Sequence, residues 1–342
     1  MSSVPTDPLA LPPYLVQPLV SRVTGANISC VQALGSEAYV GCANGELLRY
    51  ALQADSSDPS QLESYTLQSR QSLSNGKRID DLVLIPYLSR ILILCDRQVH
   101  FYTLPSLDPV PNIKPIRNVE TLAVDHQHLL RPIPSAHDPS TRLQPLEFCV
   151  IKRNAIALFS LSEERLAYSR EIPFQPGAQL ARRTGHYLCV ADDTFYNIVD
   201  LHSAQMFQLL PLSQAMDDPT PVKPFITVVS ENEFLLLSWT GASTLGMFIT
   251  GEGDPVRGTL QWPSHPLSLC LDYPYITTLL PNGTIEIHSV ETQSIVQVVS
   301  APTDGNVNGA QRVGLVASIG GYMVPSERSE KLRKTTLRFN KS

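Results

Sequence analysis

The sequence has few charged residues and no long hydrophobic run. Asp, Glu, Lys and Arg make up 17% of the 342 residues, and the net charge is only −6. So mild a balance gives no indication of nucleic-acid binding. No apolar run approaches the roughly 20 residues that a membrane helix needs. Prolines and Asp7 stand near the N-terminus, where a signal peptide has a basic and then an apolar segment. We therefore expect a soluble, cytoplasmic chain.

The sequence also lacks the short motifs that carry common chemistry. It contains no G-x-S-x-G nucleophile elbow and no phosphate-binding P-loop. The segment Gly251-Glu252-Gly253 lacks the third glycine of a dinucleotide fingerprint. No set of residues supplies a nucleophile, a base and an oxyanion hole together. We predict that the chain is not an enzyme and that it has no catalytic, cofactor-binding or metal-binding residues.

The six cysteines form no C-x-x-C pair, and no cluster of histidines accompanies them. Five lie inside apolar runs of strand length and the sixth, Cys42, ends such a run, so we predict reduced cysteines that act as small core residues. His126, His128 and His137 lie near Asp125 and Asp138 in one insert. A metal site there is conceivable, but histidines are common in polar loops, so we interpret them as ordinary loop residues. We interpret the acidic pairs 192–193 and 217–218 as turn carboxylates.

What the sequence does contain is a repeated β-hairpin. An apolar run ends in a small or polar turn, and a second alternating run follows. The hairpins lie at 38–50, 90–104, 148–161, 187–201, 233–249, 275–290 and 314–324. Equivalent points are about 46 residues apart on average, which is the spacing of propeller blades. Two polar, proline-rich inserts, 53–78 and 125–145, explain the longest steps.

Seven such units predict an all-β, seven-bladed β-propeller in a single domain. Further short apolar runs between the hairpins supply the extra strands of a four-stranded blade. The alternative is a pair of β-sandwiches with a repeat that arises by chance. The regular spacing and the absence of any long helical pattern favour the propeller.

The expected domain organisation has three parts. Residues 1–25 form a Pro-rich segment that either adds an outer strand or crosses the surface, and 26–325 form the propeller. Residues 326–342 carry six Lys or Arg against two Glu. This last segment is either a basic tail for an acidic partner or membrane face, or the start of a surface helix or a ragged chain end. We favour the second interpretation.

The segment 233–299 resembles the citron homology (CNH) domain. The matching pieces are EFLLL, LGMF, the G-x-x-x-R-G of 253–258, Gln261-Trp262, the region of Pro266, YPYI and GTIEIHSVETQSIVQVV. Within that class, 26–50 and 89–112 are similar to the N-terminal domain of the TGF-β-receptor-associated protein family. That family includes the fungal vacuolar-sorting subunit of the CORVET endosomal tether, and the high Pro and Ser content favours a fungal member. The resemblance covers about 300 residues.

The resemblance implies a propeller that begins a tethering subunit. It implies a non-enzymatic interaction domain that acts in vesicle tethering and fusion and in protein transport at endosomes and vacuoles. Its expected partners are an early-endosomal Rab-type small GTPase and other class C tether subunits, through which it associates peripherally with membranes. In that family a long α-solenoid follows the propeller, whereas this chain ends at Ser342. The alternatives are a CNH regulatory domain of a Rho or kinase signalling protein, or a propeller enzyme.

The resemblance assigns structural roles only. Trp262, Phe248, Tyr273 and Tyr275 are expected to pack blades, and the glycines 253, 258 and 283 to serve turns that need unusual backbone angles. We expect Arg257 to form an ion pair at a blade edge rather than a contact with a partner. The residues that bind partners are not predicted.

Overall fold

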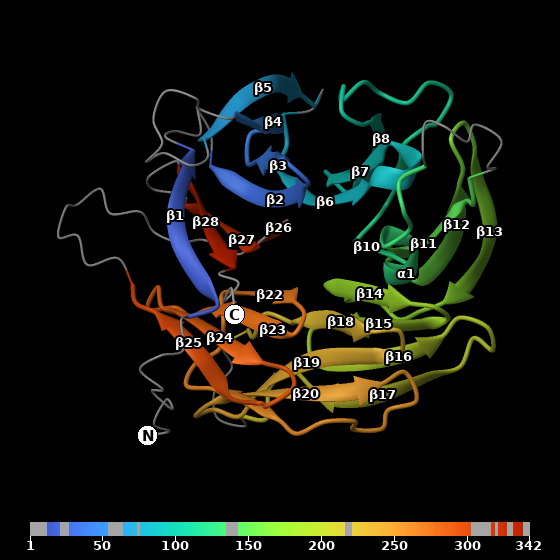
Figure 1. Cartoon of the computed structure of the whole chain (residues 1–342). Helices are drawn as coiled ribbons and strands as arrows, with labels where there is room; N and C mark the ends of the chain where they lie inside the picture. Colours follow the sequence, from blue (N-terminus) through green and yellow to red (C-terminus); the bar gives the residue numbers. More distant parts are fainter. Residues whose placement is uncertain are drawn as a thin grey trace. The chain divides into compact units, whose positions relative to one another are not determined.

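The computed structural model describes residues 12–20, 27–53, 64–73, 76–134, 143–215, 221–301, 316–318, 321–326 and 331–337. These residues form 28 β-strands and very little helix (Figure 1). The helical elements among them are η1 (Pro86–Leu88) and α1 (His126–Leu129). The strands agree with the predicted all-β class.

Every described sheet has four strands, and neighbouring strands within a sheet are antiparallel. In the six sheets built from consecutive strands, the two middle strands come from one predicted hairpin. They are the most apolar strands because they are covered on both faces, as in β7 (Arg90–Cys95, RILILC) and β19 (Glu233–Trp239, EFLLLSW). The outer strands have one free edge and read as more polar.

The chain divides into two compact units, and the larger is Asp80–Pro263. It holds four sheets, each made of four strands that are consecutive in the chain. The sheets are β6 (Ile79–Ile85), β7, β8 (Gln98–Thr103) and β9 (Ile116–Arg117); β10 (Thr121–Val124), β11 (Leu146–Lys152), β12 (Ala155–Leu161) and β13 (Leu166–Pro173); β14 (Leu180–Thr184), β15 (Tyr187–Ala191), β16 (Phe195–Asp200) and β17 (Met206–Pro211); β18 (Ile226–Ser230), β19, β20 (Thr244–Thr250) and β21 (Leu260–Trp262).

The other unit combines the two ends of the chain, Met1–Ile79 and Ser264–Ser342. Two of its sheets again use consecutive strands: β2 (Ile28–Leu34), β3 (Glu37–Cys42), β4 (Glu46–Gln53) and β5 (Ser64–Ser72); and β22 (Ser268–Asp272), β23 (Tyr275–Leu279), β24 (Ile285–Ser289) and β25 (Ile295–Val299). Its third sheet has the order β1 (Tyr14–Val20), β28 (Lys331–Leu337), β27 (Gly321–Ser326) and β26 (Val316–Ser318).

These sheets correct the predicted number of blades. Six blades, not seven, are built from four strands that follow one another in the chain. The hairpin at 314–324 contributes β26 and β27, but the strands that complete their sheet come from both ends of the chain: β28 pairs with β27 and with β1. The interpretation of 326–342 as the start of a helix is also wrong, because Lys331–Leu337 form a strand.

The core consists of the apolar faces of neighbouring blades. In the larger unit, one cluster joins the sheets β6–β9 and β10–β13 through Leu92, Phe101 and Phe148. Another joins β14–β17 and β18–β21 through Tyr196, Phe234 and Leu236. Trp262 is fully buried, as predicted. Stacking of this kind positions the turns at both ends of each blade.

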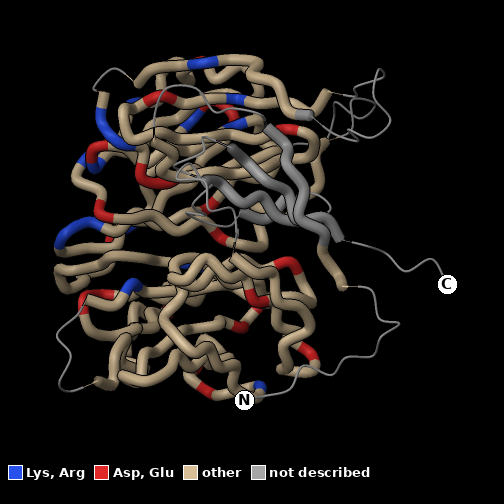
Figure 2. The backbone as a smooth tube through the Cα atoms, turned by 90° about the vertical axis from the view of Figure 1, so that its left-hand side faces the viewer, with Lys and Arg blue, Asp and Glu red and all other residues tan. Residues whose placement is uncertain are grey.

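Charged residues are interspersed along the chain rather than gathered by sign. Figure 2 shows acidic and basic residues alternating at turns and strand ends, with long uncharged stretches between them. This pattern matches the low charged fraction of the sequence. Within the described residues, no helix has the length and apolar character needed to cross a membrane.

Candidate partner-binding surface

The outer strand β17 presents apolar side chains at a free sheet edge. It reads MFQLLP, carries no charge and pairs only with β16 within the described sheets. Met206 lies opposite Val199 and Phe207 opposite Ile198, and these two outer side chains are 44% and 41% exposed. As neighbours in a strand, the two side chains point to opposite faces. Met206 shares the face of Val199, which packs toward β10–β13, and Phe207 shares the face of Ile198, which packs toward β18–β21.

The turn from β20 to β21 lies against this strand. Gly253 has a φ of +96°, and a Cβ at this position would approach the Phe207 ring to 3.1 Å. Only glycine accepts that backbone angle and that contact without strain. Val256, three residues on, is 48% exposed, and its backbone N–H donates to the carbonyl of Phe248 over 3.0 Å. Phe207, Gly253 and Val256 together are called the β17 surface below.

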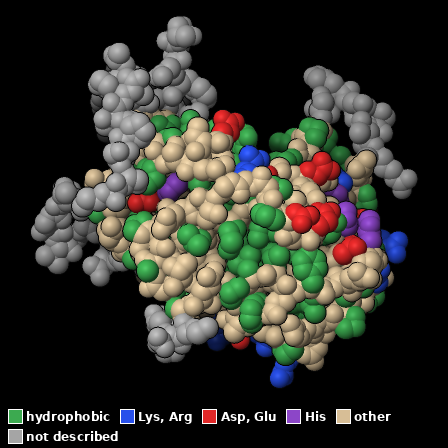
Figure 3. All heavy atoms as spheres, turned by 90° about the horizontal axis from the view of Figure 1, so that it is seen from below, with side chains coloured by type: hydrophobic (Ala, Val, Ile, Leu, Met, Phe, Trp, Pro, Cys, Tyr) green, Lys and Arg blue, Asp and Glu red, His purple; other side chains and the backbone are tan. Residues whose placement is uncertain are grey.

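Figure 3 views the side of the molecule that β17 and β20 border in Figure 1. Hydrophobic side chains gather there, with acidic and histidine side chains at the margin of the group.

The acidic margin begins at Glu252. Its carboxylate accepts hydrogen bonds from the Tyr187 hydroxyl over 2.5 Å and from the Asn232 amide over 2.8 Å. These hydrogen bonds lower the pKa of Glu252 to about 2, so the side chain is ionised at neutral pH. The ring of Tyr187 leaves no room at Gly251, where a Cβ would lie 2.2 Å from the ring carbons. A donor on each of two blades therefore fixes the Glu252 carboxylate.

Asp200 and Asp254 extend the acidic margin. Asp200 lies opposite Tyr187 in the sheet and accepts hydrogen bonds from the Ser203 hydroxyl over 2.6 Å and from the backbone N–H of His202 over 2.8 Å. These hydrogen bonds lower the pKa of Asp200. The imidazoles of His186 and His202 stack beside it, with centroids 4.9 Å apart. Asp254 is exposed next to Gly253.

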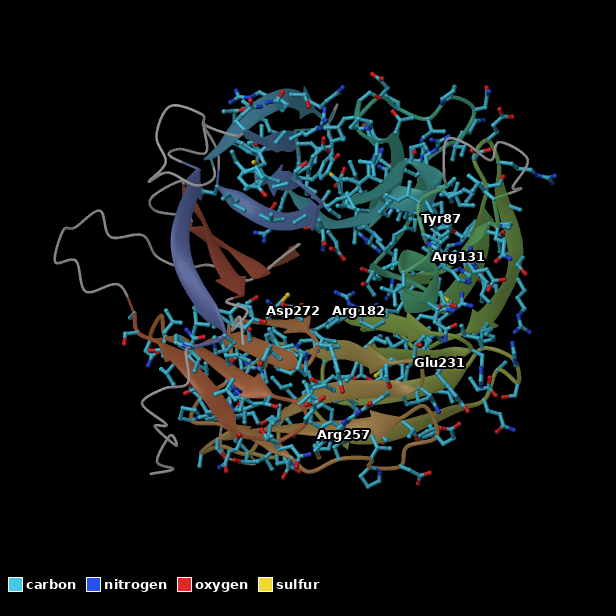
Figure 4. The ribbon with its side chains drawn as sticks, viewed as in Figure 1. Tyr87, Arg131, Arg182, Glu231, Arg257 and Asp272 are labelled. Carbon is cyan, nitrogen blue, oxygen red and sulfur yellow. The ribbon has the colours of Figure 1, made fainter. Side chains whose placement is uncertain are left out.

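Arg257 adds little positive charge to this region because its guanidinium is paired. Its Nε and one terminal nitrogen donate to the two carboxylate oxygens of Glu233 over 2.5 and 3.0 Å. Its guanidinium also lies 5.9 Å from the centre of the Phe248 ring. The prediction of a blade-edge ion pair is confirmed. Figure 4 shows Arg257 and Glu231 at separate turns of the same blade.

A cavity of about 660 Å³ opens at the other end of β17. Its walls come from two neighbouring blades and combine apolar residues with one acid and one base. They are Gln179, Asp193, Thr194, Phe195, Pro211, Leu212, Ser213, Ala215, Pro221, Val222 and Lys223. Gln179 donates to Asp193 over 2.6 Å. The volume of the cavity lies in the range of small-molecule sites.

The histidine insert forms a structural clamp. The Asp125 carboxylate accepts from the backbone N–H groups of Gln127 and Gly185, each over 3.1 Å, and so caps α1 and ties it to the turn between β14 and β15. The N–H of Glu147 donates to Nδ1 of His128 over 3.1 Å. Burial lowers the pKa of His128. The neutral imidazole that this hydrogen bond requires is therefore favoured.

Beyond α1, Arg131 fixes the chain to η1. Its guanidinium lies 5.2 Å from the centre of the Tyr87 ring and donates to the Tyr87 hydroxyl over 3.1 Å. Figure 4 shows the two side chains next to each other. His137, Asp138 and the acidic pair 217–218 lie outside the described residues. In the part of the chain that is described, no group of three or more His, Cys, Asp or Glu side chains is placed to hold a metal ion.

Most of the predicted structural roles are confirmed. Phe248 is buried, and the ring of Tyr275 packs edge-on against Tyr14 at 5.7 Å. Gly283 has a φ of +81° in the turn before β24. Tyr273 does not pack between blades, because it is 54% exposed. Gly258 does not adopt a positive φ.

The predictions for the cysteines and for Asp192 are confirmed as well. The six cysteines are free, and four of them are buried. Asp192 accepts from the backbone N–H groups of Thr194 and Phe195, so it is a turn carboxylate. Sequence reasoning missed the β17 surface. The uncharged run 206–211, directly after a predicted hairpin, is the signal that indicates it.

Comparisons with known proteins identify the family. The chain belongs to the VPS3 N-terminal domain family, whose model matches residues 24–302. This assignment confirms the resemblance inferred from the sequence.

The relatives carry vacuolar-sorting and receptor-associated names. Transforming growth factor-beta receptor-associated protein 1 of Homo sapiens is 27% identical over 277 residues, which cover 80% of this chain and 30% of that protein. Vacuolar protein sorting-associated protein 3 of Saccharomyces cerevisiae is 21% identical over 316 residues, 88% of this chain and 29% of that protein. The chain thus spans about a third of the length of these relatives.

Solved structures show the same fold. The AfRom2 CNH domain matches with a TM-score of 0.61 at 16% identity, covering 95% of this chain and 99% of that one. The WD40 β-propeller domain of Doa1 matches with a TM-score of 0.60 at 15% identity, covering 96% and 98%. At such low identity these similarities establish a propeller fold and nothing about activity.

Proposed function

We propose that this chain is a non-enzymatic interaction domain of a tethering subunit, of the CORVET type, that acts in vesicle tethering and fusion at endosomes and vacuoles. Family membership supports the trafficking role, because relatives carry vacuolar-sorting names. Its partners are an early-endosomal Rab-type small GTPase or other tether subunits. The domain is cytoplasmic and associates peripherally with the membrane through those partners.

One observation carries the proposal that the domain works by binding. The β17 surface exposes Phe207 and Val256 at the edge of a rigid blade, and the acidic side chains beside it are already ordered by hydrogen bonds. A preformed surface binds a partner at a low cost in conformational entropy. The partner of the proposed function docks on this surface.

The alternatives have less support. A propeller enzyme gathers catalytic side chains from three or more blades, whereas the cavity of about 660 Å³ is lined by two blades and holds one carboxylate, Asp193. The similarity to the AfRom2 CNH domain concerns the fold alone. Membership in the VPS3 N-terminal domain family therefore favours tethering over Rho or kinase signalling.

The test is a pull-down of the purified chain against a panel of Rab GTPases loaded with a GTP analogue or GDP. We expect binding to an early-endosomal Rab in the GTP form, reduced at least tenfold by Phe207→Ser. The matched control is Tyr168→Ser on the outer strand β13, where the tyrosine is 57% exposed. A folded chain that binds no Rab in either nucleotide state contradicts the GTPase part of the proposal.

A further inference from the structure

β17 differs from the other outer strands of the described blades. β5 carries Arg70, β9 carries Arg117, and β13 carries Arg170 and Glu171. Charges of this kind keep a free edge from pairing with another chain. β25 (IVQVV) has no charge, but the side-chain amide of its Gln297 binds the backbone of Tyr14 through two hydrogen bonds of 2.8 and 2.9 Å. β1 (YLVQPLV) is uncharged but contains Pro18, and β21 (LQW) is uncharged but has three residues, of which Leu260 and Trp262 are buried. β17 combines an uncharged six-residue sequence with a free edge and exposed apolar side chains.

The pairing of β17 with β16 shows which backbone groups are free. The N–H of Asp200 donates to the carbonyl of Gln205 before the strand, and the N–H of Leu212 donates to the carbonyl of Thr194 after it. Because antiparallel pairs alternate, the amide of Phe207 faces β16 and the amides of Met206 and Gln208 face outward. Pro211 has no N–H and ends the free edge. The register shift opposite Tyr196 and Asn197 interrupts this alternation after Gln208, so an added strand can pair at 206–208.

We propose that the β17 surface accepts an extended segment of a partner as an added β-strand, and that the face of this segment turned toward Phe207 combines apolar with basic side chains. This inference rests on the proposed function only in taking the β17 surface as the place where a partner binds. Backbone hydrogen bonds to the free edge hold the segment, and its apolar side chains cover Phe207 and Val256.

The charges beside the strand select the basic partner. Asp200, Glu252 and Asp254 border the β17 surface, and the hydrogen bonds from Tyr187 and Asn232 hold the Glu252 carboxylate in place. The basic side chains nearby are already engaged: Arg257 is neutralised by Glu233, and Arg170 donates to the carbonyl of Leu201. A second copy of this chain is disfavoured because its own acidic margin would approach this one.

The experiment uses the whole chain and two capped ten-residue peptides as probes. Along one face of the extended peptide, leucine alternates with lysine in the first probe and with glutamate in the second, and serine occupies the other face. Fluorescence anisotropy gives the two affinities, and hydrogen–deuterium exchange locates the bound peptide. We expect the lysine peptide to bind at least tenfold more tightly and to slow exchange at the amides of Met206 and Gln208. The double variant Glu252→Gln, Asp254→Asn is expected to reduce the preference for lysine.

Two controls keep the test specific. Phe207→Ser is expected to weaken binding of the lysine peptide, and Tyr168→Ser on β13 is expected to leave its affinity unchanged. Equal affinity for both peptides, or slowed exchange at β13 instead of β17, overturns the inference. The Rab pull-down reports separately on the proposed function: a Rab that binds through Phe207 while the peptides show no preference rejects only the added strand.

Discussion

At the residue scale, single contacts set the geometry of the β17 surface. The tightest contact is at Gly251, because a Cβ there would lie 2.2 Å from the ring of Tyr187. The ring cannot stay in place beside any larger residue, so its hydroxyl would lose Glu252 as well. The position therefore needs glycine for space rather than for backbone freedom.

We predict that Gly251→Ala destabilises the chain by about 1–3 kcal/mol, the usual cost of overpacking. The measurement is unfolding in urea, followed by fluorescence. Gly258→Ala is the matched control, since Gly258 is exposed in the same turn and has no positive φ. Its effect is expected to stay within about 0.5 kcal/mol. Equal stability of the two variants would show that Tyr187 moves without cost.

The hydrogen bond from Tyr187 to Glu252 predicts a pH dependence. It lowers the pKa of Glu252 to about 2 and raises that of Tyr187 to about 12. A carboxylate whose pKa is lowered by folding adds stability above its unfolded pKa of about 4.3. That stability is lost as the pH falls toward 2.

We therefore expect the stability difference between wild type and Tyr187→Phe to be constant above about pH 5 and to narrow below about pH 4. Denaturant unfolding across this range measures it, and an NMR titration of the Glu252 carboxyl carbon checks the shift directly. A difference that stays the same from pH 6 to pH 3 would exclude this hydrogen bond in solution.

At the scale of elements, α1 is too short to be stable by itself, so its contacts hold it. Asp125 is 3% exposed and accepts from Gln127 and Gly185, and its second oxygen lies 3.8 Å from the Arg183 guanidinium. Arg183 also donates to Glu147 over 2.8 Å. One carboxylate thus joins a helix start to the next blade.

We predict that Asp125→Ala costs about 3 kcal/mol, because it removes the cap and leaves the buried Arg183 with one carboxylate fewer. Asp125→Asn keeps the oxygen that accepts from Gln127 and Gly185, so it is expected to cost less than half as much. Urea unfolding gives both values, and exchange of the Gly185 amide reports the local contact. An equal loss of stability in the two variants would mean that the charge of Asp125 next to Arg183, and not its hydrogen bonds to Gln127 and Gly185, stabilises the chain.

The sequence predicted elements better than it predicted their assembly. Alternating apolar runs located the middle strands of the six blades built from consecutive strands, for example 187–201 for β15 and β16, because residues buried on both faces leave a strong pattern. Outer strands are half exposed, so the sequence of β17 shows only a weak apolar pattern. The number of blades was wrong because the hairpin 314–324 shares its sheet with β1 and β28, and local patterns carry no information on such distant partners.

At the scale of the whole molecule, the chain start is bound to a blade formed near its end. Tyr14 is 1% exposed, and its hydroxyl donates to Asp272 over 2.9 Å. Its backbone binds the Gln297 side chain, 283 residues away in the sequence. A contact between such distant residues forms only when both parts of the chain are in place, since closing so long a loop costs entropy before the contact repays it. Tyr14 therefore reports on the integrity of this unit.

Tyr14→Ala removes a buried aromatic ring and the donor to Asp272, so we expect a loss of about 3–5 kcal/mol. Tyr14→Phe keeps the ring against Tyr275 and loses the hydroxyl only, for a cost of about 1–2 kcal/mol. Hydrogen–deuterium exchange separates the units: in Tyr14→Ala the amides of β22–β25 are expected to exchange faster, while those of β14–β17 keep their protection. If β14–β17 lost protection equally, the two units would unfold together, and the contacts of Tyr14 would stabilise the proposed β17 surface as well.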